Sequence, residues 1–394
     1  MKKLLLIGID TRSMLNSALK LDYTIFSTSY FSTSDTPTIQ NQKIVLKEES
    51  DVSCGSFEEK FDGKHLLEIS SDYIDEVDYI IPISGVSPSD FTKHDKKKIL
   101  GTCYVKDIEN KYKFYKKIKN KFLTPKTFSI SDMDEALEIK NSCPNNQFIL
   151  KPLKGSGGYD INLLDNGEDI EFNDSKFILQ EYVPGINLSS SILASKNDTE
   201  TIMTSRLLTM NDFEKNNSFI YVGNILPLTN ESIMSDVENV DDIKMEMMDT
   251  SQELSKEFNL LGSNGVDYIF NEDGLYVIEI NPRIQGTFEC VEMSLGINML
   301  DAHIKACFGN IIEIPKAKYY AYKKIIYSPT RMKYENLKLD NIYDLPHIGS
   351  ITEKSQPLLT IIDKDTDFEK LYKKVETTSE KVNELAKRNQ LSEE

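Results

Sequence analysis

The first hundred residues alternate apolar runs with an amphipathic stretch. Residues 3–9 and 23–27 are apolar and β-branched, residues 11–20 between them carry a helical pattern, and residues 77–83 form another apolar run. Strand, helix and strand in this order predict an open α/β unit that ends near residue 105. The turn after the first strand holds a single glycine, Gly8, so we do not expect this unit to bind NAD.

The middle of the chain mixes helical and strand patterns. Helices are expected at residues 106–120 and 132–139, and short strands around residues 127–128, 148–150 and 177–179. Residues 186–230 alternate in strand fashion around turns. A long acidic helix is predicted at residues 235–258, with its apolar positions at Met245, Met248, Leu254 and Phe258.

A hairpin is the clearest local prediction. Apolar runs at residues 265–270 and 275–280 flank the dipeptide Asp273-Gly274, a strong turn signal, so the two strands should pair antiparallel. The last 80 residues add strand signals at 325–327 and 358–362 and a polar helical tail at 367–388. The whole pattern predicts a mixed α/β and α+β protein.

Composition excludes several classes of function. The chain has 394 residues, 39% of them hydrophobic, and a formal net charge of -17, which repels nucleic acid and anionic membranes. We therefore expect no nucleic-acid partner, and the lack of a long apolar run predicts no membrane association. The five cysteines have no CxxC spacing and the four histidines are dispersed, so we expect a cytoplasmic protein without disulfides or zinc.

A glycine-rich loop follows one predicted strand. It comprises Lys154, Gly155, Ser156, Gly157 and Gly158. Glycines free a loop to present several backbone N–H groups, which suits phosphate oxygens. A surface turn explains the same residues, and the loop is not a P-loop because the GxxxxGK[ST] pattern is missing.

The hairpin carries three oxygen-bearing side chains. Glu279 and Asn281 point to one face of their strand, and the turn folds Asp267 back beside them. Neighbouring carboxylates repel unless a cation separates them, and such hard ligands suit Mg²⁺. A solvated strand face is the alternative, although both strands are apolar.

Two further sets of polar residues are candidates. Arg283, one of five arginines, lies two residues past Asn281 and suits bidentate binding of a phosphate or carboxylate, or a structural salt bridge. Gln180, Glu181, Tyr182 and Val183 leave a predicted strand, where backbone groups and a carboxylate suit a purine edge and a ribose. A similar pattern is expected wherever a strand leaves the core and enters a loop, so these residues alone do not specify a nucleotide site.

Taken in order, six segments resemble the ATP-grasp superfamily, in the branch that includes biotin carboxylase and carbamoyl phosphate synthetase. They are NKYKFY with Lys111, FILKP with Lys151, the KGSGG loop, QEYVPG, GVDYIF and IEINPR. The resemblance covers roughly residues 1–310. It implies an N-terminal pre-ATP-grasp α/β domain at 1–105, an ATP-grasp domain at 106–314 with a lid at about 125–182, and a small C-terminal β-rich domain with a helical tail at 315–394.

The resemblance also implies the roles of single residues. Lys111 and Lys151 are expected to contact the phosphates of ATP, with Lys151 also reaching the adenine, and the glycine loop to form a lid. Glu181 is expected to hold ribose, and the backbone of Tyr182 and Val183 to read adenine. The resemblance implies that Asp267, Glu279 and Asn281 bind Mg²⁺ or Mn²⁺. It also implies two catalytic residues, Lys151 and Arg283, of which Arg283 stabilises a phosphorylated intermediate.

Departures from the family pattern bear on the substrate. Biotin carboxylases follow this Arg-Ile-Gln with a glutamate that acts as the bicarbonate base, whereas Gly286, Thr287 and Phe288 stand here, and Glu289 comes later. The chain resembles a group named ATP-dependent carboligases related to biotin carboxylase more closely than it resembles the biotin carboxylases themselves. The segments that carry this resemblance are the GxDxR start, YVGNILP and NPRIQGTFE.

We expect a carboxylate–amine ligase that acts on small molecules through an acyl phosphate. Carboxylation through carboxyphosphate and a non-catalytic ATP-binding module are the alternatives. Arg12, Arg206 and Glu289 are candidates for the acceptor pocket. Because members of this branch often dimerise, a homodimer is one expectation about assembly.

Overall fold

An open parallel sheet forms the N-terminal unit of the computed structural model, which describes residues 1–46, 61–155, 157–164, 176–213 and 218–391. The strand order is β3-β2-β1-β4, and all three pairings are parallel. The strands are β1 (Lys2–Gly8), β2 (Tyr23–Ser29), β3 (Asn41–Ile44) and β4 (Tyr79–Pro82), with helices α1 (Arg12–Ala18), α2 (Gly63–Ile69) and α3 (Ser71–Glu76). The predicted strand–helix–strand order is confirmed.

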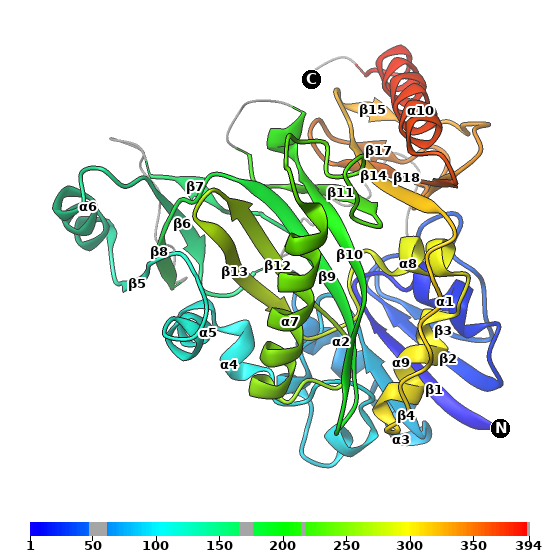
Figure 1. Ribbon diagram of the computed structural model, residues 1–394. Helices are drawn as coiled ribbons and strands as arrows, with labels where there is room; N and C mark the ends of the chain where they lie inside the picture. The colour runs from blue at the N-terminus through cyan, green and yellow to red at the C-terminus, as the bar shows by residue number, and fades with distance from the viewer. Residues whose placement is uncertain (47–60, 156, 165–175, 214–217, 392–394) are drawn as a thin grey trace.

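A small antiparallel sheet with the order β5-β8-β6-β7 lies at the other side of the molecule (Figure 1). Its strands are β5 (Thr127–Ile130), β6 (Phe148–Pro152), β7 (Asn162–Leu163) and β8 (Phe177–Glu181), and α6 (Met133–Ser142) packs beside it. The segment that leads into this sheet folds as α4 (Lys106–Glu109) and α5 (Lys111–Ile118). One predicted helix at 106–120 is therefore two, because Asn110 caps the second through its side chain.

An eight-stranded sheet with the order β13-β12-β9-β10-β11-β14-β18-β16 forms the centre. Its strands are β9 (Ile186–Ala194), β10 (Thr199–Thr209), β11 (Tyr221–Leu226), β12 (Gly262–Asn271), β13 (Gly274–Asn281), β14 (Tyr320–Tyr327), β16 (Ile342–Tyr343) and β18 (Pro357–Asp365). β14, β18 and β16 thus continue the central sheet. How the chain divides into domains stays a prediction.

Helix α7 (Val240–Phe258) packs against β9 and β10 (Figure 1). Leu254 and Phe258 are buried as predicted, but Met245 and Met248 are 60% and 37% exposed, so that part of the prediction is wrong. The buried face instead includes Ser251 and Ser255, whose hydroxyls bond to hydroxyls of the sheet. A polar-looking position is buried here because its small side chain is satisfied by hydrogen bonds.

The remaining elements surround the C-terminal strands and the N-terminal unit. They are α8 (Phe288–Leu295), α9 (Met299–Cys307), β15 (Met332–Lys333), β17 (Ile351–Thr352), α10 (Phe368–Arg388) and the 3₁₀ turns Pro88–Asp90, Asp95–Lys98 and Met210–Asp212. The predicted helical tail is α10, whose apolar face packs on β14 and β18. Among the described helices, none combines the length and the apolar character needed to cross a bilayer.

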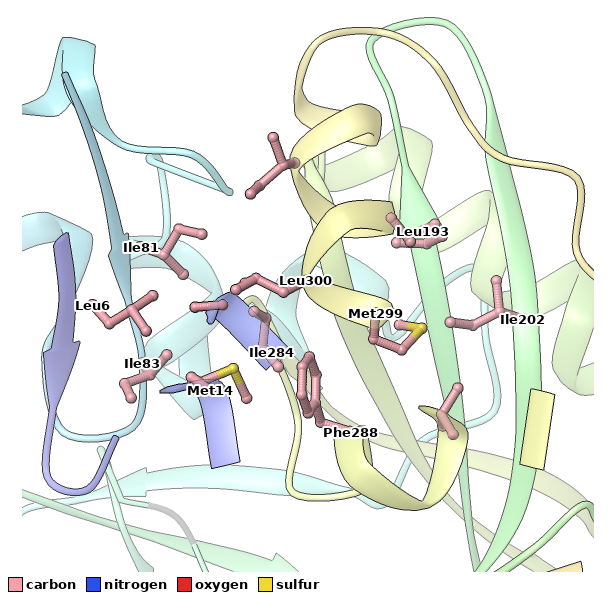
Figure 2. Close-up of a cluster of buried hydrophobic side chains, with 14 of the residues drawn as sticks. Leu6, Met14, Ile81, Ile83, Leu193, Ile202, Ile284, Phe288, Met299 and Leu300 are labelled. Carbon is pink, nitrogen blue, oxygen red and sulfur yellow. The ribbon is translucent and has the colours of Figure 1, made fainter. Parts of the chain in front are cut away.

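A hydrophobic cluster joins the N-terminal unit to the centre. Figure 2 shows Leu6, Met14, Ile81 and Ile83 facing Ile284, Phe288 and Leu300, with Met299, Leu193 and Ile202 behind them. Burial of these side chains fixes the carboxyl ends of β1 and β4 against the segment that follows β13. The ends of an open α/β sheet, where ligands commonly bind, therefore face the central hairpin.

Candidate functional site

A cavity of about 450 Å³ lies between the small sheet, the hairpin β12–β13 and the N-terminal unit. Thirteen of the residues singled out in the sequence line it: Lys111, Lys151, Gly155, Gly157, Gly158, Gln180, Glu181, Tyr182, Val183, Asp267, Glu279, Asn281 and Arg283. Lys154 lines an adjoining cavity of about 330 Å³ instead. Ser156 lies outside the described residues.

The hairpin brings its three oxygen-bearing side chains together. Asp267 and Glu279 are register partners on antiparallel strands, and the predicted pairing is confirmed. Asn281 donates from Nδ2 to Asp267 Oδ2 at 2.8 Å. Ser189 on β9, which the sequence did not single out, donates to Asp267 Oδ1 at 2.6 Å. Two carboxylates and an amide oxygen thus face the cavity as hard donors that suit a divalent cation.

The two carboxylates differ in their electrostatic surroundings. Burial and the charge of Glu279 raise the pKa of Asp267 to about 7. Burial acts in the same direction on Glu279, but the positive charges of Lys111, Lys151 and Arg283 outweigh it, so the pKa of Glu279 is lowered. Within the described residues, no third Asp, Glu, His or Cys joins this pair as a metal ligand. A bound cation relieves the repulsion between neighbouring carboxylates.

Two lysines from distant parts of the chain meet beside Glu279. Lys111, at the start of α5, donates to Glu279 Oε2 at 2.7 Å and to the Gly155 carbonyl at 3.2 Å. Lys151 on β6 is buried, and its Nζ donates to Gln180 Oε1 at 2.8 Å. Burial and the charge of Lys111 lower the pKa of Lys151 to about 8. The two ammonium groups form a positive wall suited to phosphate.

The glycine loop closes over β11. Gly157 and Gly158 adopt φ angles of 76° and 78°, which favour glycine. A Cβ on Gly158 would lie 1.9 Å from the carbonyl oxygen of Phe219. The Gly157 carbonyl accepts the Tyr221 N–H at 3.0 Å. This close backbone approach requires glycine and brings the loop to the cavity mouth.

The segment after β8 forms another part of the cavity wall. Glu181 accepts hydrogen bonds from the Asn146 side chain and from the Lys126 N–H, the latter at 3.3 Å. The Tyr182 N–H donates to the Gln147 carbonyl at 2.9 Å, so it is engaged within the protein. The carboxylate of Glu181 still lines the cavity, where it can accept hydroxyl groups.

Arg283 lies beyond the end of β13 and still faces the cavity. Its nitrogens make long hydrogen bonds to Asn281 Oδ1 and the Ile284 carbonyl, at 3.3 and 3.4 Å. Among the described residues, no carboxylate forms an ion pair with its guanidinium group. The structural salt bridge considered from the sequence is therefore absent from the described part of the chain. The guanidinium is suited to a ligand anion.

Gln285 is a site residue that the sequence did not single out. Its Oε1 accepts from Ser191 at 3.0 Å, and its Nε2 donates to Ser189 at 3.2 Å. Its amide lies directly over Gly265, where a Cβ would come within 1.7 Å. The serine run of β9 and the glycine of β12 were the available signals, because only small residues leave room for a side chain above a strand.

The three acceptor candidates do not line the cavity. Arg12 is buried, and its two terminal nitrogens donate to Glu289 at 2.9 and 2.7 Å. Its Nε donates to Asp344 at 2.5 Å. Arg206 pairs with Asp212 at 2.5 Å. These groups hold elements together. Other residues of the N-terminal unit, of β11 and of the segment after β13 line the cavity instead: Asp10, Ser13, Ser84, Tyr221, Asn224, Gly286 and Thr287.

The chain is similar in sequence to known proteins. A family model described as the ATP-grasp domain matches residues 108–287. An uncharacterised protein of Methanocaldococcus jannaschii is 30% identical over 373 residues, covering 92% of this chain and 88% of the relative. Tyramine–L-glutamate ligase of the same organism is 28% identical over 186 residues, covering 46% of each chain.

Solved structures share the fold. N5-carboxyaminoimidazole ribonucleotide synthetase of Thermotoga maritima superimposes with a TM-score of 0.70 at 15% identity, over 96% of this chain and 98% of that one. Biotin carboxylase of Campylobacter jejuni gives a TM-score of 0.70 at 14% identity, over 96% and 90% of the two chains. An Aspergillus clavatus N5-carboxyaminoimidazole synthase, solved with ADP and 5-aminoimidazole ribonucleotide, gives 0.71 at 13% identity, over 98% and 99%.

Proposed function

The chain belongs to the ATP-grasp family, and from this premise we propose that it is an ATP-dependent ligase that joins a carboxylate to an amine. ATP phosphorylates the carboxylate, and the amine then displaces phosphate from the acyl phosphate to form an amide, ADP and phosphate. One observation carries the proposal. A single cavity holds a carboxylate pair, two lysines and an arginine that is free of carboxylate partners among the described residues.

The hairpin is the proposed metal site. Asp267, Glu279 and Asn281 would hold Mg²⁺ or Mn²⁺, which fits the burial and the repulsion by Glu279 that together raise the pKa of Asp267. When bound, the ion would neutralise charge on the triphosphate. Lys111, which already contacts Glu279, is placed to bind the same phosphates.

The proposed nucleotide site runs from the hairpin to β8. Lys151 and Gln180 form a bonded pair in the cavity wall, and Glu181 would accept the ribose hydroxyls. Because the Tyr182 N–H is engaged with Gln147, the adenine edge would use other backbone groups of residues 181–183. The glycine loop, including Gly157 and Gly158, would close over the phosphates through its backbone N–H groups.

The proposed chemistry needs no protein nucleophile. Arg283 would stabilise the negative charge that develops on the transferred phosphoryl group and on the acyl phosphate. Exclusion of water by the glycine loop would protect this intermediate from hydrolysis. Lys151 would stay protonated beside the bound triphosphate, since an adjacent anion favours the charged form of an amine.

Amide formation is favoured over carboxylation. Tyramine–L-glutamate ligase, the named sequence relative, is by its name an amide-forming enzyme. Glu289, the acid that follows the Arg-Ile-Gln motif, is bound bidentately to Arg12 and does not line the cavity, so it is not placed to act as a bicarbonate base. Small-molecule substrates suit a cavity of about 450 Å³. The homodimer stays a prediction.

The test is ATP-dependent hydroxamate formation. The protein is incubated with MgATP, hydroxylamine and a panel of carboxylates that includes L-glutamate, and hydroxamate and ADP are measured. Glu279→Gln should abolish both, whereas Asp273→Asn, at the exposed turn of the same hairpin, should not. Absence of hydroxamate and ADP across the panel would refute the ligase, and bicarbonate-stimulated ADP release alone would favour carboxylation.

A further inference from the structure

The N-terminal unit contributes one carboxylate to the cavity wall. Asp10 follows β1 directly and lines the cavity together with Ser13 and Ser84. Building on the proposed function, we propose that Asp10 binds the ammonium group of the amine substrate. The cavity would then hold ATP at one end, beside Lys111, and a cationic acceptor at the other.

The Asp10 carboxylate is held in place but is not neutralised by a cation. Its Oδ1 accepts the Arg12 N–H at 3.1 Å, a local bond at the start of α1 that sets the orientation of the side chain. Among the described residues, no side-chain nitrogen of a Lys, Arg or His forms an ion pair with its oxygens. Asp10 therefore has a fixed geometry and lacks a counter-ion in this part of the chain.

Arg12 is the nearest candidate for that counter-ion, but it is committed elsewhere. Its terminal nitrogens donate to Glu289 at 2.9 and 2.7 Å, and its Nε donates to Asp344 at 2.5 Å. Asp35 lies 3.7 Å from the same Nε. Three carboxylates thus share one guanidinium, and Asp344 adds negative charge near Asp10.

The electrostatics of Asp10 call for a cation. Burial and the charge of Asp344 raise its pKa to about 7. Asp10 is half-buried. A carboxylate that is partly removed from water without a counter-ion is costly, and an ammonium group at hydrogen-bond distance would relieve that cost. The arrangement destabilises the empty site and favours a cationic ligand.

The rest of the acceptor end is neutral and hydrogen-bonding. Its polar lining residues are Ser13, Ser84, Tyr221, Asn224, Gln285 and Thr287. The described cations of the cavity wall are Lys111, Lys151 and Arg283, and the proposed function assigns all three to phosphate groups. Lys323 is not among the lining residues, and it donates to the Gly286 carbonyl at 3.1 Å. The Asp10 carboxylate is therefore the charged group that this end of the cavity presents, and it suits a cationic ligand.

Hydroxylamine separates this inference from the proposed function. It is uncharged near neutral pH and attacks an acyl phosphate without needing an ammonium site. With the carboxylate that gives the most hydroxamate, we would add tyramine, putrescine or ethanolamine, and as matched neutral probes tyrosol or 1,4-butanediol. At least one cationic amine should divert the reaction to an amide or inhibit hydroxamate formation, and its neutral partner should not.

The variant Asp10→Asn keeps the shape and removes the charge. We expect it to raise the KM or inhibition constant of the effective amine about 10- to 100-fold, the usual effect of losing a charged hydrogen bond. This loss of amine affinity should exceed any change in its hydroxamate rate or its KM for ATP, and Asp10→Glu should restore part of the amine affinity. Asp273→Asn serves as a charge-matched surface control.

Each outcome has a defined meaning. Absence of hydroxamate in the wild-type protein refutes the ligase proposal itself. Hydroxamate formation that no cationic amine affects, or that tyrosol affects as strongly as tyramine, overturns the role of Asp10. So does equal amine affinity in wild type and Asp10→Asn. Stronger inhibition by O-phosphoethanolamine than by ethanolamine would show recognition of an anion instead.

Discussion

Removing one or the other carboxylate of the hairpin should change stability in opposite directions. Asp267→Asn should stabilise the metal-free protein above neutral pH, whereas Glu279→Gln should destabilise it. The two side chains are register partners, but Lys111 bonds to Glu279 alone. Burial and Glu279 raise the pKa of Asp267 to about 7, while the surrounding cations lower the pKa of Glu279.

The signs follow from proton linkage. Because the pKa of Asp267 is higher in the folded than in the unfolded state, its stabilising contribution is complete below its ordinary value of 3.8 and is lost as the pH rises to about 7. The rise of about three units corresponds to roughly 4 kcal/mol as an upper limit. Asp267 faces a cavity that admits water, so we expect about 2 kcal/mol. Glu279 contributes in the opposite sense, since its stabilisation is present above its ordinary pKa and is lost on acidification.

Thermal unfolding in EDTA and in MgCl₂ measures both effects. In EDTA at about pH 8, Asp267→Asn should raise the melting temperature by a few degrees and Glu279→Gln should lower it. MgCl₂ should stabilise the wild type and neither variant. At about pH 5 the gain from Asp267→Asn should shrink, because the wild-type carboxyl is then protonated. Equal destabilisation by both variants in EDTA would refute this account.

Three further predictions concern other parts of the molecule. Because the pKa of Lys151 is lowered to about 8, this lysine must take up a proton to bind ATP in alkaline solution. The Kd for ATP should therefore rise up to about tenfold per pH unit above that value, and calorimetry in two buffers should detect the proton uptake. A Kd that does not change with pH would contradict this prediction. Glu289→Gln removes one of the negative charges that compensate the buried Arg12 guanidinium. It should lower the free energy of unfolding by about 3 kcal/mol in denaturant titrations. A change below about 0.5 kcal/mol would show that the Arg12–Glu289 pair does not stabilise the fold. Gly158→Ala places a Cβ 1.9 Å from the Phe219 carbonyl oxygen and so displaces the glycine loop. It should raise the KM for ATP about tenfold, while the circular dichroism spectrum stays unchanged. An unchanged KM would argue against a role of the loop in ATP binding.

Local features of this protein are readable from the sequence. The Asp273-Gly274 turn and the period-two alternation of β12 and β13 set the pairing from Asn271–Gly274 to Tyr268–Val277. Regular pairing beyond this point would set Asp267 opposite Ile278, but a β-bulge next to Asp267 sets it opposite Glu279 instead. The local pattern therefore predicts the hairpin, whereas the bulge decides that Asp267 shares a face with Glu279. The order of strands and helices in the N-terminal unit follows in the same way from short apolar runs.

Long-range packing decided the rest. The buried face of α7 depends on the sheet it covers, and Ser251 turns inward because Ser190 offers it a hydrogen bond. The sequence contains Arg12, but nothing local to it predicts its pairing with Glu289, 277 positions away. An arginine near the end of a first strand suits an acceptor pocket equally well, and only the fold shows that this one is bound to carboxylates.

The acceptor end of the proposed site also depends on contacts between distant segments of the chain. Asp10 reaches the cavity because the cluster in Figure 2 packs the ends of β1 and β4 against the segment after β13. Residue periodicity determines neighbours within a hairpin or helix, where the chain itself sets the geometry. Contacts between distant segments depend on how whole faces bury their apolar surface, and no local pattern encodes which faces meet.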